Sequence, residues 1–67
     1  MKTNLTEQRI TRLRIEEYLE EVESAERTAA LTDCEDVREN FLFVAERARR
    51  NVQMLREQLR RLQEACP

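Results

Sequence analysis

The absence of internal helix breakers constrains the fold of this chain more than any other feature. The sequence contains no glycine, and its single proline is Pro67. Because glycine and proline are the usual points at which a helix is interrupted, long helices are the expected structure. One start signal lies at Asn4, whose side chain can cap a first turn, with Glu7 three residues later in capping-box spacing.

A second start signal lies near the middle of the chain. Thr32 or Asp33 can cap a new helix, and Glu35 and Asp36 follow in its first turn, where acidic side chains favour the helix dipole. We therefore expect one domain over residues 1–67, with helices at about 4–30 and 33–65 and a turn at about 31–33. Since a short turn makes its two helices antiparallel, the predicted fold class is an all-α, antiparallel two-helix hairpin.

Apolar residues predict how the helices face each other. In the second helix, apolar residues recur at alternating intervals of three and four positions over more than four heptads, from Cys34 to Cys66. Arg38 is the one polar interruption of this pattern. The first helix has the same rhythm, continued weakly backwards through Thr11 and Gln8. The predicted seam, packed like a coiled coil, consists of Ile15, Tyr18, Val22, Ala25, Ala29, Phe41, Ala45, Ala48, Val52, Leu55, Leu59 and Leu62.

A hairpin of 67 residues is marginal by itself. A structural metal is not expected, because there is no histidine and the two cysteines are far apart in sequence. On one continuous helix Cys34 and Cys66 lie roughly 48 Å apart, whereas a disulfide needs Cα atoms within about 7 Å. Self-association is the remaining way to enlarge the core of so short a chain, and we expect a homodimeric four-helix bundle. Both thiols are interpreted as small hydrophobic seam residues, with a link between Cys34 and Cys66 of two chains as the alternative.

Several large apolar residues do not fit the seam. Val37 and Val44 widen it on one flank and Leu42 on the other, while Phe43 lies on the far side of the second helix; Ile10 and Leu13 lie on the back of the first, with Met54 near their level. They are either the core of a homodimer or a docking surface for another protein, and both roles are compatible. The candidate partner-binding residues are Leu42, Phe43, Val44, Ile10, Leu13 and Met54.

Charge is distributed unevenly although the net charge is only −2. Residues 16–26 contain six acidic and no basic side chains, whereas residues 47–61 contain six arginines against Glu57. A hairpin then has an acidic turn end and a basic open end, which favours an antiparallel dimer. The basic end is also a candidate for phosphate contact, although arginines at such positions are more often solvated flanks or ion-pair partners. The candidate phosphate-binding residues are Arg9, Arg12, Arg56, Arg60 and Arg61.

Catalysis has little support in the residues. Glu16, Glu17 and Glu20 form an EExxE pattern that resembles the first magnesium motif of the all-α nucleotide pyrophosphatases of the MazG type. That family also has an ExxD pair on a later helix, and here Glu35 is followed by Arg38 at the position of its second acid. We therefore interpret the three glutamates as a solvated acidic face. We expect no enzymatic activity, cofactor or small-molecule substrate.

The expected function is binding. The longest apolar run, Phe41 to Ala45, has five residues, so we expect no membrane span and a cytoplasmic protein. At the level of architecture the hairpin looks like the RNA-binding plasmid copy-number dimers of the Rop type and like the small hairpin co-chaperones of type III secretion. These likenesses transfer no residues. We expect a self-associating adaptor, inhibitor or chaperone that binds another protein; the alternative is a regulatory nucleic-acid-binding dimer.

Overall fold

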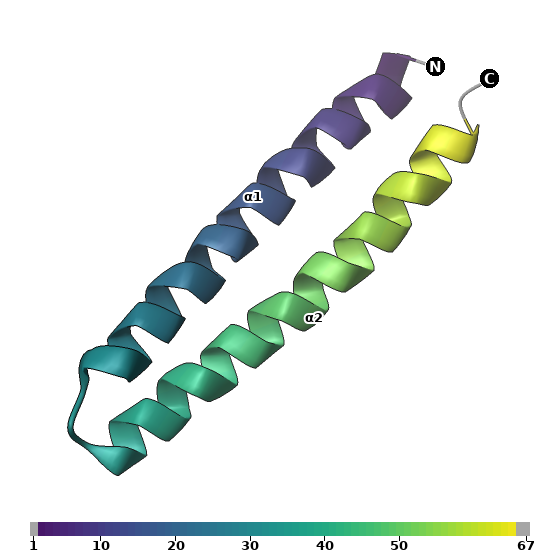
Figure 1. Ribbon diagram of the computed structural model, residues 1–67. Coiled ribbons are helices and arrows are strands. Elements are labelled where there is room, and N and C mark those ends of the chain that lie inside the picture. Colours follow the sequence, from purple (N-terminus) through teal and green to yellow (C-terminus); the bar gives the residue numbers. More distant parts are fainter. Residues whose placement is uncertain (1, 66–67) are drawn as a thin grey trace.

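A computed structural model describes residues 2–65, with the side chains of residues 4–65. Helix α1 spans Lys2–Leu31 and helix α2 spans Glu35–Ala65. The helices lie side by side along their length, with the turn at one end and the start of α1 beside the end of α2 at the other (Figure 1). The predicted two-helix hairpin is confirmed. It is a rod with Cα extents of 51 × 14 × 11 Å, and we call its ends the turn end and the open end.

The N-terminus of α1 differs from the sequence prediction. The helix begins at Lys2, two residues before the predicted position, so Asn4 lies inside it. The Asn4 Oδ1 atom accepts a hydrogen bond of 2.7 Å from Gln8 Nε2, one helical turn along. Asn4 therefore stabilises an interior turn and does not form the predicted cap, because an i,i+4 amide pair is available once the helix extends past it.

The turn shows how α2 begins. Thr32 Oγ1 accepts a hydrogen bond of 3.2 Å from the backbone N–H of Cys34, and Cys34 O accepts the first bond of α2, from Arg38 N at 2.9 Å. Cys34 is thus the residue that flanks the helix, one or two positions after the predicted cap residues Thr32 and Asp33. Glu35 and Asp36 occupy the first turn, where their charges favour the positive end of the helix dipole.

The C-terminus of α1 is capped by a side chain from the other helix. No residue between 2 and 65 has a positive φ, so the left-handed cap that commonly ends a helix is absent from this range. Instead, the Arg38 guanidinium donates to Ala29 O at 3.3 Å and to Thr32 O at 2.8 Å. It also contacts Glu35 Oε1 at 3.2 Å. The one polar residue of the α2 seam therefore binds carbonyl oxygens that the end of α1 leaves without a helical partner.

The core between the helices is built mostly from small side chains. Val22, Ala25, Ala45 and Ala48 form its centre, and Tyr18, Phe41 and Val44 pack against this cluster while remaining partly exposed. Alanine on both helices allows a close approach of the backbones. Within the described residues no large side chain is fully buried. The hairpin therefore buries little apolar area for its length.

The open end of the seam is more polar on α1. Gln8 and Thr11 are buried there, and Thr11 Oγ1 donates to Glu7 O at 2.7 Å. On α2 the leucines of this end, Leu55, Leu59 and Leu62, are only half-buried. Apolar burial consequently decreases from the turn end towards the open end.

Candidate interaction surface

The structure places every predicted seam residue in or beside the contact between the helices. Seven of them are the buried apolar residues of the hairpin, Ile15, Val22, Ala25, Ala29, Ala45, Ala48 and Val52. The other five are half-buried: Tyr18, Phe41, Leu55, Leu59 and Leu62. A half-buried apolar residue still presents surface to solvent. The seam itself therefore contributes to the exposed apolar area.

The candidate partner-binding residues near the turn end do not share one face. Leu42 and Phe43 are exposed, and Phe43 leaves 60% of its surface in solvent. Val44 instead packs against the core cluster. Consecutive helical residues point about 100° apart, so three neighbours cannot form one flat surface. Leu42 and Phe43 remain the accessible pair.

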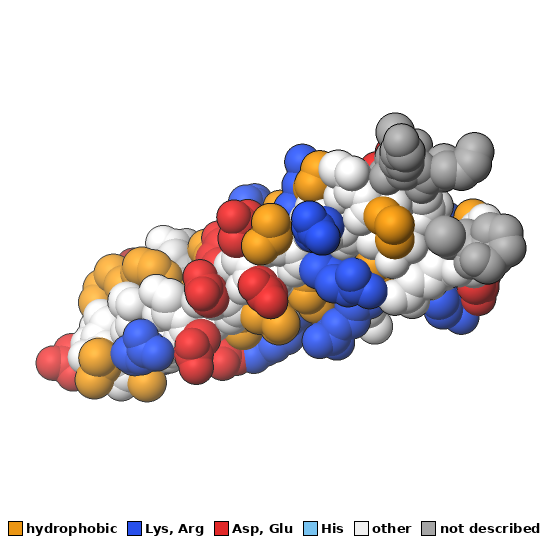
Figure 2. Space-filling model, turned by 90° about the horizontal axis from the view of Figure 1, so that it is seen from above, with side chains coloured by type: hydrophobic (Ala, Val, Ile, Leu, Met, Phe, Trp, Pro, Cys, Tyr) orange, Lys and Arg blue, Asp and Glu red, His pale blue; other side chains and the backbone are white. Residues whose placement is uncertain are grey.

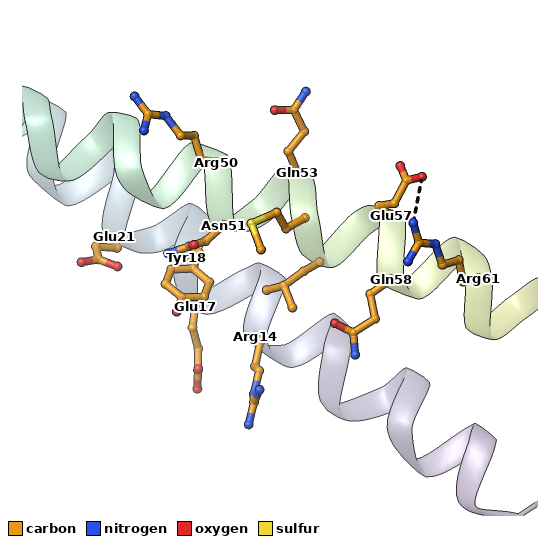
Figure 3. A pocket seen from close by; sticks show the side chains of 12 residues that line it. Arg14, Glu17, Tyr18, Glu21, Arg50, Asn51, Gln53, Glu57, Gln58 and Arg61 are labelled. Carbon is orange, nitrogen blue, oxygen red and sulfur yellow. Dashed lines mark ion pairs between the residues drawn. The ribbon is translucent and has the colours of Figure 1, made fainter.

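A shallow groove of about 1120 Å³ runs along one side of the hairpin near its middle. Tyr18 from α1 and Leu55 from α2 contribute to its lining, with Met54, which is 69% exposed, beside them. Figure 3 shows Tyr18 between the helices, below Asn51. We call this side the Tyr18 face. The lining residues are Arg14, Glu17, Tyr18, Glu21, Arg50, Asn51, Gln53, Met54, Leu55, Glu57, Gln58 and Arg61.

Met54 is separated from the residues with which the sequence grouped it. Ile10 and Leu13 are exposed, but neither lines the groove that contains Met54. The sequence predicts that Ile10, Leu13 and Met54 lie at one level along the rod. Two residues at the same level can still point in different directions around their helix axes. Met54 therefore belongs to the Tyr18 face, whereas Ile10 and Leu13 are open surface of α1.

The amide side chains of the groove were not anticipated. Asn51 is half-buried and Gln58 is exposed, and both line the groove. The heptad repeat Val37, Val44, Asn51, Gln58, one position before the seam repeat that starts at Arg38, is the sequence signal that could have found them. Asn51 forms no side-chain hydrogen bond with residues 4–65, so its amide is available to another molecule.

Acidic and basic side chains are concentrated in different halves of the rod. Figure 2 shows acidic side chains between the turn end and the middle, followed by a cluster of Lys and Arg towards the open end. Residues 18–51 contain nine acidic and five basic side chains, whereas residues 2–17 and 52–65 together contain five acidic and seven basic. The turn half is therefore net negative and the open half net positive.

Ion pairs use only part of this charge. Glu26 and Arg49 form an ion pair between the helices, and Glu57 pairs with Arg60 at 2.7 Å and with Arg61 at 4.0 Å. Two of the candidate phosphate-binding arginines are thus partnered within α2. Arg9, Arg12 and Arg56 are exposed and form no ion pair with the described side chains.

Other sequence features have no converging geometry. Among the described side chains, no group of three His, Cys, Asp or Glu residues is arranged to hold a metal ion, and this includes Glu16, Glu17 and Glu20. Cys34 is a free, exposed thiol, whereas Cys66 lies outside the described residues. Over the described range, neither helix has an apolar stretch long enough to cross a bilayer.

Comparison with known proteins identified no relative of this chain. No protein-family model, no curated protein and no solved structure matches the chain.

Proposed function

We propose that this chain is a non-enzymatic protein-interaction module that self-associates and binds a partner protein through apolar helix surface, as an adaptor, inhibitor or chaperone of the cytoplasm. One observation carries the proposal. The hairpin has a core mostly of alanine and valine, with Ile15 as its largest aliphatic member, while large apolar side chains, among them Phe43 and Met54, remain mostly in solvent. Exposed apolar groups of this size on a small rod are typical of surfaces that another chain covers.

The exposed area supports the same conclusion. The chain exposes 5541 Å², whereas a compact monomer of 8.1 kDa is expected to expose about 4,500 Å². The excess of about 1,000 Å² per chain is slightly more than the roughly 800 Å² that each partner contributes to a standard protein interface. The excess is therefore large enough to form an interface with a further chain.

Two separate surfaces are available for the two kinds of association. Leu42 and Phe43 lie towards the turn end and point away from the core, where an aromatic and an aliphatic side chain can act as anchors for a partner protein. The Tyr18 face lies near the middle of the rod. We assign partner binding to Leu42 and Phe43 and self-association to the Tyr18 face.

Partner binding is tested with the double variant Leu42→Gln/Phe43→Gln. The tagged chain is expected to co-purify a defined partner from the cells that make it, and the double variant is expected to lose this partner while keeping its helicity and its mass in solution. Glu46→Gln, another exposed substitution about one turn away, is the matched control. Equal recovery of the partner with the double variant would overturn the assignment of this surface.

Self-association is tested by light scattering under reducing conditions over a range of concentrations down to micromolar. The expected mass is twice 8.1 kDa. A helical monomer at every concentration would overturn this part of the proposal.

Regulatory nucleic-acid binding is the second candidate, and one observation favours it. Arg9, Arg12 and Arg56 are exposed near the open end without an ion-pair partner among the described residues, so their guanidinium groups are free to contact phosphates. A gel-shift experiment with duplex DNA and RNA at low ionic strength tests it. Binding should decrease steeply as the salt concentration rises, and also when Arg9, Arg12 and Arg56 are all replaced by glutamine. No shift at the lowest ionic strength would exclude nucleic-acid binding.

A further inference from the structure

We infer that the Tyr18 face is the dimer interface, and that a second copy of this chain packs on it antiparallel, with the turn end of each copy against the open end of the other. This inference rests on the proposed self-association through the Tyr18 face and adds its direction and register. It follows from three observations: the distribution of charge along the rod, the positions of Arg14 and Glu21, and the composition of the groove.

The distribution of charge determines the direction. The turn half of the rod carries nine acidic and five basic side chains, and the open half carries five acidic and seven basic. A parallel dimer would place the two net-negative halves together. An antiparallel dimer places each net-negative half against a net-positive half, and this complementarity favours it.

Arg14 and Glu21 determine the register. They lie one heptad apart on the same side of α1, and both line the groove. The midpoint between them falls between Glu17 and Tyr18, close to the middle of Lys2–Leu31. A two-fold axis at this point overlaps the two rods over nearly their full length. The same axis brings Arg14 of each copy opposite Glu21 of the other, because a two-fold interface pairs each contact with its reciprocal.

Near the two-fold axis, the groove offers an apolar contact surface and a polar side chain without a hydrogen-bond partner among residues 4–65. The Tyr18 ring and the side chains of Met54 and Leu55 form its apolar part. The amide of Asn51 is half-buried and has no hydrogen-bond partner among residues 4–65. Two asparagine side chains that meet across a helical interface can hydrogen-bond to each other and fix its register at some cost in stability. Asn51 is in the position to do so here.

The register is tested with charge reversals. Arg14→Glu and Glu21→Arg should each raise the dimer dissociation constant by at least about tenfold, because each change converts two attractive contacts of the dimer into two repulsive ones. An equimolar mixture of the two variants should form a heterodimer, since both contacts are then attractive. Arg9→Glu and Glu16→Arg make the same charge changes at exposed positions outside the groove, and they should leave the dissociation constant within about twofold. Unchanged dimerisation of both groove variants, or no gain on mixing, would overturn the register.

The direction is tested on the unaltered interface. A spin label on Cys34, in a chain with Cys66→Ser, marks the turn end. In the antiparallel dimer the two labels lie near opposite ends of a rod whose long extent is 51 Å, and pulsed electron resonance should report a distance close to that value. A distance below about 25 Å, little more than two interhelical spacings, would mean a parallel dimer, which overturns this inference while the proposed self-association stands. Absence of any coupling, with a monomeric mass, would overturn both, and the partner experiment with Leu42 and Phe43 would be unaffected.

Discussion

Arg38 Nε donates a hydrogen bond of 3.3 Å to the backbone oxygen of Ala29, nine residues earlier and on the other helix. Together with the bond from Nη2 to Thr32 O at 2.8 Å, it joins the first turn of α2 to the last turn of α1. Helix α1 has no basic residue in its own last turn. Arg38 therefore supplies both the hydrogen-bond donors and the positive charge that this terminus favours.

Replacement of Arg38 by methionine should lower the free energy of unfolding by about 1–3 kcal/mol, because two charge-assisted hydrogen bonds to partly buried carbonyl oxygens are lost. Urea unfolding followed by circular dichroism at one fixed protein concentration measures the change. Arg27→Met is the control, since Arg27 is exposed and its pairing with Glu23 at 3.9 Å lies within one helix. That change should cost no more than about 0.5 kcal/mol. Equal losses for the two variants would show that the cap contributes nothing.

Enlargement of the alanine core should destabilise the hairpin. Ala45 is fully buried, with 0% of its surface exposed, so Ala45→Leu has no space for its added carbons and should cost about 1–3 kcal/mol. In a domain of this size the loss corresponds to a decrease in Tm of at least roughly 4 °C. Ala30→Leu places the same side chain at an exposed position of α1, where we expect no decrease. A thermal scan of both variants makes the comparison, and a Tm for Ala45→Leu equal to that of the parent would contradict the close packing.

The ion pair between Glu26 and Arg49 should contribute little to stability despite joining the two helices. Their side chains are 43% and 55% exposed, so water and salt screen the attraction. A double-mutant cycle with Glu26→Gln and Arg49→Gln should give a coupling energy of about 1 kcal/mol or less at low salt. The coupling should decrease further in 1 M NaCl. A larger, salt-insensitive coupling would mean that another chain buries this pair in solution.

Substitution of Gln8 by leucine should raise the stability. Gln8 is buried at the open end, where α2 presents the half-buried side chains of Leu59 and Leu62. A leucine there adds apolar burial of about 1 kcal/mol and leaves Asn4 able to bind water. Glu7→Leu adds the same side chain at an exposed neighbouring position and should have a smaller effect. Chemical unfolding of both variants tests the prediction, and a loss of stability with Gln8→Leu would show that the Asn4–Gln8 hydrogen bond outweighs the apolar gain.

The order of residues was sufficient to predict both helices and the residues between them. Ile15, Val22, Ala45 and Val52 are buried where the three-and-four spacing placed them. Helical periodicity is a local property, which side chains three and four residues apart reveal without knowledge of the partner helix. Exact helix ends were less predictable. Asn4 had a suitable capping side chain, but the helix continued past it.

Two long helices, and the stripe of each that faces the other, follow from the order of residues, because the absence of internal breakers and the apolar period act through neighbouring residues. The packing of the two helices shows which polar groups meet across the hairpin and which apolar side chains remain exposed. Arg38, which interrupts the apolar seam in the sequence, caps the C-terminus of α1. Val44 packs against the core, whereas Phe43 is exposed to solvent. These contacts depend on the direction and distance between side chains of different helices, and the spacing of residues along a single helix does not contain that information.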